Sequence, residues 1–332
     1  MSSLICLLLF AFSNAQDIHF SQFTKSPLNL NPSYTGLFDG DFRFGGIHRN
    51  QWKSVTVPYK TFSGYFDMNT ALANSKDSRI GAGILINNDK AGDSEYGITG
   101  AALSGSMIKS LGSDAVHFLS GGLQLGFVQQ SFNYSKLTFD NQFNGDVFDP
   151  TIPVSENFTD DKYIYFDLSA GIGWMYTVNE KLNLGAGVGI FHINKPKQTF
   201  MNDEDSKLDQ KISFDARSMI AVHEKVYLLP GILFSTQDKF QEFDLGSNVK
   251  FILNENPGKK INLYAGGFVR TKDAIIFSAG FDYNELNFGF SYDMNTSDLK
   301  RASNNRGGYE VSLTYIIKKV KPVGIHPPCP VY

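Results

Sequence analysis

The stretch YIYFDLSAGIGWMYTVNEKLNLGAGVGIFH, residues 163–192, contains two runs in which apolar residues alternate with polar or small ones. Every second residue of 182–190 is apolar, and the residues between them are asparagine or glycine. Residues 164–176 follow the same pattern, with Asp167, Ser169 and two glycines on the second face. Successive side chains of a β-strand point to opposite faces, so this period predicts strands with one apolar face and one polar face.

Similar runs follow one another along the chain, and no long segment has a helical period. About 14 runs can be placed, an even number that is typical of bacterial outer-membrane barrels. Several are about 10 residues long, which is enough to cross a bilayer when the strand is tilted. A content of 31 Gly, 29 Phe and 15 Tyr suits a close-packed interior and aromatic girdles. The runs begin near Phe42, Tyr59, Ile80, Tyr96, Val116, Tyr163, Leu182, Ile212, Val226, Phe240, Ile261, Ala274, Leu286 and Tyr309.

The connection lengths favour the same architecture. Long connections are expected at 133–162 and 194–211, and tight turns near 179–180 and 223–225. If the strands alternate in direction, both long connections fall at one end of the barrel and both tight turns at the other. Barrels have long extracellular loops and short periplasmic turns, so the pattern fits. Two short exceptions fall on the long-loop side, at 237–239 and 271–273.

A soluble β-sandwich also has alternating strands, so it is the competing fold. It would need two sheets that bury their apolar faces against each other. The number and length of the runs favour the barrel. So does the cysteine content, because removal of a leader containing Cys6 leaves Cys329 alone and excludes an intramolecular disulfide.

The first residues have the pattern of a secretory signal peptide. Leu4–Phe12 is apolar, and Ser13-Asn14-Ala15 offers small residues for cleavage after Ala15, although no Lys or Arg precedes Lys25. The net charge of −3 argues against a nucleic-acid partner. We expect the following organisation: signal peptide 1–15, N-terminal plug or arm 16–40, barrel 41–318, and a Pro/Lys-rich tail 319–332.

The segment Asp17–Gly36 precedes the first run and has a different character. Pro27 and Pro32 disfavour a regular strand, and Asn31-Pro32 favours a turn. Two readings remain open. The segment forms a partial plug in the periplasmic mouth of the barrel, or it is an arm packed against the barrel wall.

Three motifs carry a resemblance to a known family. They are DIHFSQF (17–23), NLNPSYTG (29–36) and HRNQW (48–52). GYEVSLTY (308–315) and a Cys-Pro pair at 329–330 complete the pattern. Together they resemble the PorP/SprF family of the Bacteroidetes, and the likeness extends over the whole mature chain. The family-motif residues, for which a structural role is expected, are Asn31, Pro32, Tyr34, Gly36, His48, Arg49, Gln51 and Trp52.

The resemblance implies an outer-membrane barrel of the type IX secretion system, which is linked to gliding motility. Its partners would be membrane lipid, other secretion components and a large secreted adhesin with a C-terminal sorting domain. The protein would help that adhesin reach the cell surface or stay anchored there. The alternative is a channel for a small hydrophobic or polar solute, since a barrel of this size can enclose a pathway.

An acidic connection offers a candidate contact for a partner. Residues 140–161 contain six carboxylates and no basic residue, and phenylalanines interrupt them. A solvated loop is one reading. The other is a contact for a basic partner or a calcium-assisted contact with an adhesin. The candidate residues are Asp146, Phe148, Asp149, Phe158, Asp160 and Asp161.

The sequence indicates no catalytic or cofactor site. The six His residues are scattered, and His326 with Cys329 offers two metal ligands at most. An outer-membrane enzyme stays conceivable because catalytic triads assemble in space, but no nucleophile stands out. The GAGVG run, 185–189, lies in a strand with no following helix, so its glycines are expected to permit close packing inside the barrel. At the outer end of the first strand, Trp52 would anchor the interface, and Arg49 would line the lumen or meet headgroups.

Overall fold

The computed structural model describes most of the chain. The described residues are 17–51, 59–72, 75, 77–92, 95–112, 116–133, 137, 139–149, 151–153, 161–179, 181–200, 206–256, 258–297 and 304–318. The expected signal peptide and C-terminal tail lie outside them, as do Trp52, Phe158 and Asp160.

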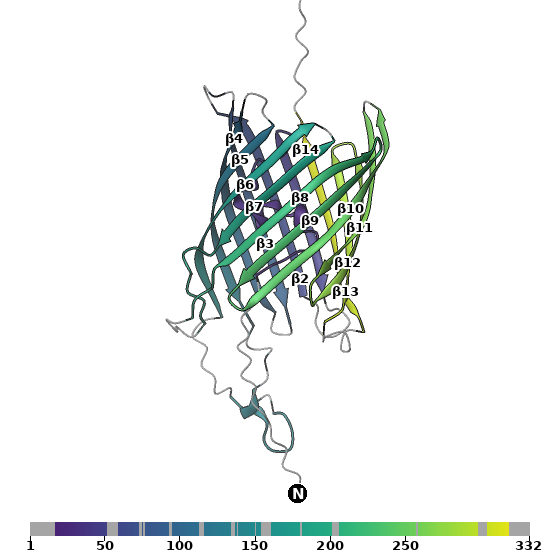
Figure 1. The fold of residues 1–332 in the computed structure, drawn as a ribbon. Helices are drawn as coiled ribbons and strands as arrows, with labels where there is room; N and C mark the ends of the chain where they lie inside the picture. Colours follow the sequence, from purple (N-terminus) through teal and green to yellow (C-terminus); the bar gives the residue numbers. More distant parts are fainter. Residues whose placement is uncertain are drawn as a thin grey trace, which may run out of the picture.

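The described residues form a closed antiparallel barrel of 14 strands, in which each strand pairs with its neighbours in sequence and β1 pairs with β14 (Figure 1). The strands are β1 (Phe42–Gln51), β2 (Tyr59–Ala71), β3 (Ser78–Ala91), β4 (Tyr96–Leu111), β5 (His117–Ser131), β6 (Lys162–Asn179), β7 (Leu182–Phe191), β8 (Lys211–His223), β9 (Val226–Gln237), β10 (Phe240–Asn256), β11 (Lys259–Arg270), β12 (Ala274–Tyr283), β13 (Leu286–Asn295) and β14 (Arg306–Ile317).

The alternating pattern located the strands to within three residues, and the early starts of three of them have one cause. Ser78, Lys211 and Arg306 each begin a strand up to three residues before the expected start. These residues are polar, so they do not extend the apolar pattern. The ladder continues through them because its hydrogen bonds join backbone groups only.

The barrel wall is apolar outside and polar inside. Leu103, Phe127 and Ile164 are each 65% exposed, because they point outward from the barrel. The residues that alternate with such outward side chains point inward and are mostly buried and polar. They include Ser104, Ser120, Gln124, Ser169, Asp215, Asp244, Asp293 and Glu310. This inversion is the arrangement of a barrel in lipid, where the outward band contacts hydrocarbon and the closed ladder satisfies every backbone group. The protein is therefore an outer-membrane barrel.

The two ends of the barrel differ as the connection lengths predicted. The connections after β5 and β7 run to β6 and β8 at one end, which we call the long-loop end. The turns after β8 and β12 lie at the other, the short-turn end, where Phe42 of β1 pairs with Ile317 of β14. Long loops of such barrels are extracellular, so the short-turn end faces the periplasm.

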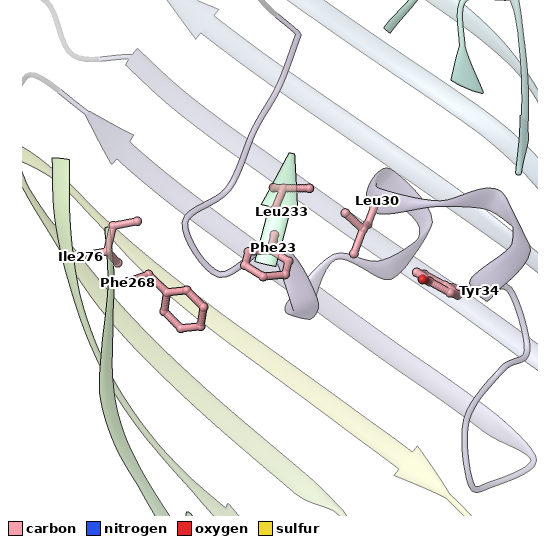
Figure 2. Packing of buried hydrophobic residues seen from close by; sticks show 6 residues of the cluster. All are labelled: Phe23, Leu30, Tyr34, Leu233, Phe268 and Ile276. Carbon is pink, nitrogen blue, oxygen red and sulfur yellow. The ribbon is translucent and has the colours of Figure 1, made fainter. Parts of the chain in front are cut away.

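The chain before β1 forms three short helices inside the barrel (Figure 2). They are η1 (Phe23–Lys25), α1 (Pro27–Leu30) and η2 (Pro32–Tyr34). Phe23, Leu30 and Tyr34 form an apolar cluster with wall residues Leu233, Phe268 and Ile276. The rings of Phe23 and Phe268 meet edge to face, with centroids 5.8 Å apart. None of the helices among the described residues is long and apolar enough to cross a membrane.

Candidate functional site

Residues 17–41, here called the lumen segment, run along the inside of the barrel from one end to the other. Near the long-loop end, Asp17 N donates to Gln237 Oε1 over 3.2 Å, and the Asp17 carboxylate pairs with His192. Near the short-turn end, Gly36 N donates to Asp67 Oδ2 over 2.7 Å. The segment then enters β1.

The expected location in the periplasmic mouth alone is therefore wrong. The sequence motif gives no information on depth, and the inner wall offers polar partners along its whole length. The segment contacts β2, β4, β6, β8 and β14, among others. An arm on one part of the wall would contact only neighbouring strands.

The family motif at 31–36 docks through its own backbone and short side chains. Asn31 caps η2, since its Oδ1 accepts from Ser33 N over 2.9 Å, and its Nδ2 donates to the Ile172 carbonyl. Ser106 Oγ donates to the Thr35 carbonyl over 2.5 Å. Tyr34 reaches furthest, donating its hydroxyl proton to Asp215 on β8 over 2.8 Å. The motif is thus fixed to strands on both sides of the lumen.

Inward glycines make room for this docking. A Cβ added at Gly122 would lie closer than 3.0 Å to the Pro32 carbonyl and to Ser33 N. Added at Gly171 or Gly187, it would collide with Asn31. Glycine is the residue that allows such close approach of another backbone. Gly187 belongs to the GAGVG run, and its contact agrees with the close packing expected there.

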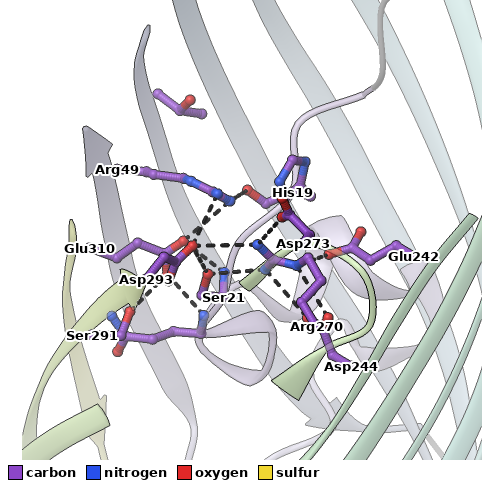
Figure 3. Close-up of polar contacts among 12 residues, drawn as sticks. His19, Ser21, Arg49, Glu242, Asp244, Arg270, Asp273, Ser291, Asp293 and Glu310 are labelled. Atoms are coloured by element: carbon purple, nitrogen blue, oxygen red, sulfur yellow. Dashed lines mark hydrogen bonds and ion pairs between the residues drawn. The ribbon is translucent and has the colours of Figure 1, made fainter. Parts of the chain in front are cut away.

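The β11–β14 side of the segment is held by charge (Figure 3). Arg49 lies 3.2 Å from Asp293 and 3.5 Å from Glu310, and it donates to the His19 carbonyl over 2.9 Å. Glu310 accepts from Ser21 N over 2.7 Å and from Gln22 N over 2.9 Å. These side chains are buried, so each charge depends on its partners.

Arg270 extends this network across three strands. It lies 2.9 Å from Glu242, 3.2 Å from Asp244 and 3.4 Å from Asp293. Its second terminal nitrogen donates to Ser21 Oγ over 3.0 Å. The lumen segment is therefore a member of the charge network and not only a neighbour of it.

Ion pairs of His192 with Asp17 and Asp167, here called the His192 latch, join the first described residue to the long-loop end. His192 follows β7 and lies 2.6 Å from Asp17 and 2.8 Å from Asp167. Burial alone would lower the pKa of His192, but the two carboxylates raise it to about 10. Burial likewise would raise the pKa of Asp17, and His192 instead lowers it to about 2. The pair is therefore ionised at neutral pH.

Two cavities flank the lumen segment. The larger, about 310 Å³, lies between η1 and strands β6–β13. Asn183 and Asn287 line it toward the short-turn end, and Phe268 and Ile276 toward the long-loop end. The smaller, about 120 Å³, lies between Asp17, Asn29 and the halves of β3–β6 nearest the long-loop end. Leu28 and Leu30 of the segment line neither cavity and are buried against the wall.

The connection after β5 carries the candidate partner residues and projects from the long-loop end (Figure 1). Its helix η4 (Asp140–Gln142) and a bridge between Phe143 and Phe148 form a small hairpin. At the tip, Asn144 Oδ1 accepts from Asp146 N and Val147 N over 3.0 Å each. Phe143, Val147 and Phe148 are 56%, 60% and 46% exposed, so the tip presents apolar side chains to solvent.

The acidic candidates that the structure describes, Asp146, Asp149 and Asp161, lie in two different places. Asp146 and Asp149 lie in the hairpin, where Asp149 accepts from Thr151 and has a pKa lowered by those bonds. Asp161 lies where the loop returns to β6, with its carbonyl accepting from Phe132 N. Among the described part of the chain, no group of three or more His, Cys, Asp or Glu could hold a metal.

The other motif residues line β1. Arg49 is buried in the lumen, which agrees with one of the two positions expected for it. His48 is partly exposed, and Gln51 pairs with Gly308 and Tyr59 at the long-loop end. Sequence reasoning missed Asp67, Asp215, Arg270, Asp293 and Glu310. Their signal was present, because each is a charged residue in a strand whose other face is apolar.

The fold and the site together define an outer-membrane β-barrel with its own N-terminal segment bound inside the lumen. The chain belongs to the family of type IX secretion system membrane proteins PorP/SprF, whose model matches residues 12–315. A comparison with curated protein sequences finds no match.

The chain is also similar to solved structures at low sequence identity. The toluene transporter TbuX of Ralstonia pickettii is 8% identical, with 88% of this chain and 92% of that chain covered and a TM-score of 0.53. A FadL homologue of Pseudomonas aeruginosa is 9% identical, with 86% and 92% covered and a TM-score of 0.49. The monoaromatic hydrocarbon channel CymD is 10% identical, with 89% and 93% covered and a TM-score of 0.49.

Proposed function

We propose that this barrel is a non-enzymatic type IX secretion component that binds a large secreted adhesin through its C-terminal sorting domain. It helps that protein reach the cell surface or remain anchored there, and it contacts other components of the secretion system. Family membership supports the secretion role. The observation that carries the binding role is the projecting hairpin, 139–153.

The hairpin has the properties of a contact surface. Phe143, Val147 and Phe148 are exposed although their backbone is held by turn and bridge hydrogen bonds. A fixed apolar tip loses little conformational entropy on binding, and its burial removes apolar surface from water. Asp146 beside it favours a partner surface that carries basic groups.

A channel for small solutes is the second candidate, and the lumen contacts weigh against it. A continuous path would require the lumen segment to leave its partners, including Glu310, Asp215 and the inward glycines. Several of these partners are charged and buried, so separation would leave uncompensated charges in the lumen.

The test is recovery of a partner from native outer membranes in mild detergent, with mass spectrometry of the copurifying proteins. The wild type should recover a large surface protein with a C-terminal sorting domain. Combined substitution Phe143→Ser, Val147→Ser and Phe148→Ser should reduce recovery at least about tenfold, since hot-spot truncations cost about 2 kcal/mol or more.

Two controls make the result specific. Phe240→Ser changes an exposed aromatic residue at the same end of the barrel, outside the hairpin, and should leave recovery unchanged. Charge reversal at Asp160 and Asp161 tests the acidic version of the contact. Full recovery by the hairpin variant would overturn the hairpin role, and recovery of the barrel alone from wild-type membranes would overturn the binding role.

A further inference from the structure

The larger cavity has an apolar wall. It has a volume of about 310 Å³ and opens beside Thr24, which is exposed inside the barrel. That volume is at the lower end of the range of about 300–1,000 Å³ that small-molecule sites occupy. The apolar side chains around it are Phe23, Met175, Met219, Leu229, Phe268 and Ile276.

One cation in this wall lacks an ionic partner. Lys25 Nζ donates to Asn287 Oδ1 over 2.7 Å and lies 5.8 Å from the centre of the Tyr264 ring. It forms no ion pair with any described residue. Asp282, the carboxylate that acts on it electrostatically, already accepts from Asn262, Tyr264 and Asn287. The ammonium is half-buried, and with no carboxylate paired to it its charge is only partly compensated.

The second cation of the wall is already engaged. Arg217 lies 3.5 Å from Asp215 and 4.1 Å from the centre of the Tyr34 ring. Two further groups that line the cavity are buried with no hydrogen-bond partner in the described structure, namely Gln22 Nε2 and Asn183 Oδ1. A buried polar group without a partner costs free energy that a bound ligand can recover.

We propose that this cavity binds a small amphiphile with an apolar body and a single anionic headgroup, a carboxylate or a phosphate. The headgroup pairs with Lys25, and the apolar body lies against Phe268, Ile276 and Met219. An anion compensates the half-buried ammonium through a charge-assisted hydrogen bond, which a neutral or cationic headgroup cannot do. Asn183 and Asn287, near the starts of β7 and β13, line the cavity at the short-turn end, so we expect the ligand to enter from the periplasmic side.

The test measures protection of a cysteine in the cavity wall. Met219→Cys is made in the full chain with Cys6→Ser and Cys329→Ser, placed in lipid nanodiscs, and modified with a methanethiosulfonate reagent, which forms a mixed disulfide with the thiolate and releases methanesulfinate. The probes are decanoate, decyl phosphate, decanol and decyltrimethylammonium. Either anion should halve the modification rate at a concentration at least about tenfold below that of the other two, as expected for a charge-assisted bond. The two anions also separate a carboxylate from a phosphate ligand.

Three variants assign the effect to Lys25. Lys25→Gln should remove the advantage of the anions, and Lys25→Arg should keep it. Lys211→Gln alters a lysine that donates to the Ile18 carbonyl and does not line this cavity, so it should behave as wild type. A reporter at lipid-facing Leu103→Cys corrects for partition of the probes into the membrane.

Equal protection by decanol and decanoate would overturn the proposal, and so would the absence of protection by any probe. An unchanged anion advantage in Lys25→Gln would overturn the assignment to Lys25. The headgroup series in the otherwise unaltered cavity stays informative even if that variant does not fold.

Discussion

The two sides of the lumen hold the same segment by different means. On the β3–β7 side, Gly81, Gly122, Gly171 and Gly187 let the motif backbone lie directly against the wall. On the β8–β14 side, long charged side chains reach the segment, and the larger of the two cavities, about 310 Å³, adjoins the same residues Ser21 and Gln22 that they bind. Close packing leaves only about 120 Å³ on the first side, whereas ion pairs fix only a few atoms and leave more volume between them. The side held by charge is thus the side with more room for a ligand.

The largest expected effect is on the charged side. Arg270→Met should lower the free energy of unfolding by about 3–5 kcal/mol, because it leaves Glu242, Asp244 and Asp293 without their shared cation. Urea unfolding of the barrel reconstituted in lipid vesicles measures it. Arg270→Lys keeps the charge, so its free energy of unfolding should fall less. An unchanged midpoint for Arg270→Met would mean that water compensates these carboxylates.

On the close-packed side, two adjacent glycines of β5 form a matched pair. Gly122→Val places side-chain atoms against Pro32 and Ser33, and should cost about 3 kcal/mol through overpacking. It should also expose Lys25 to trypsin. A Cβ at Gly121 meets nothing within 4 Å, so Gly121→Val should change neither quantity. Equal effects of the two substitutions would show that strand propensity, and not docking, is being measured.

Tyr34 tests the connection between the two sides. Tyr34→Phe keeps the ring against the glycines and removes the hydroxyl that donates to Asp215. The expected loss is about 1–2 kcal/mol, since Arg217 still lies 3.5 Å from that carboxylate. The same urea titration measures it, and Tyr65→Phe is the control. A loss as large as that of Arg270→Met would mean that the sides are not independent.

The smallest effect is a pH dependence at the His192 latch. The folded-state pKa of His192 is raised to about 10. Its contribution to the free energy of unfolding is therefore complete below about pH 6.5 and is lost as the pH rises through about 10. The pKa of Asp17 is shifted in the opposite direction. Its contribution to the free energy of unfolding is present above about pH 3.8 and is lost as the pH falls through about 2.

Hydrogen exchange at residues 17–20, corrected for the intrinsic pH dependence, should rise about tenfold between pH 6 and pH 11, the effect of one charge-assisted bond. His192→Gln should show the high rate at both pH values. His223, which lies outside the latch at the short-turn end, provides the control substitution. Flat corrected exchange in the wild type would contradict the latch.

The strands could be predicted because each carries its own evidence. Alternation in residues such as 182–190 needs no distant partner, and loop lengths order the two ends. The close packing at the glycine faces could also be predicted, since Gly185, Gly187 and Gly189 occupy one face of a strand.

The lumen site could not be predicted, because barrel closure creates it. Arg49 faces Glu310 only when β1 pairs with β14, and Arg270 meets Asp293 across separate strands. Sequence position likewise made Asp146 and Asp161 members of one acidic group, although Asp146 lies at the hairpin turn and Asp161 lies beside Phe132 where the chain enters β6. The position of the lumen segment along the barrel axis could not be predicted for the same reason. Nothing in the sequence near Asp17 indicates that His192 is its partner.

The path of the lumen segment has a consequence for membrane topology. A barrel with an even number of strands normally leaves both ends of its chain on one side. Here Ile317 ends β14 beside Phe42 on the periplasmic side, whereas Asp17 is fixed at the extracellular opening by Gln237 and His192. The polypeptide therefore crosses the membrane once more than its strand count, through the inside of its own wall. Asp17, the first described residue, and the projecting hairpin share the cell surface.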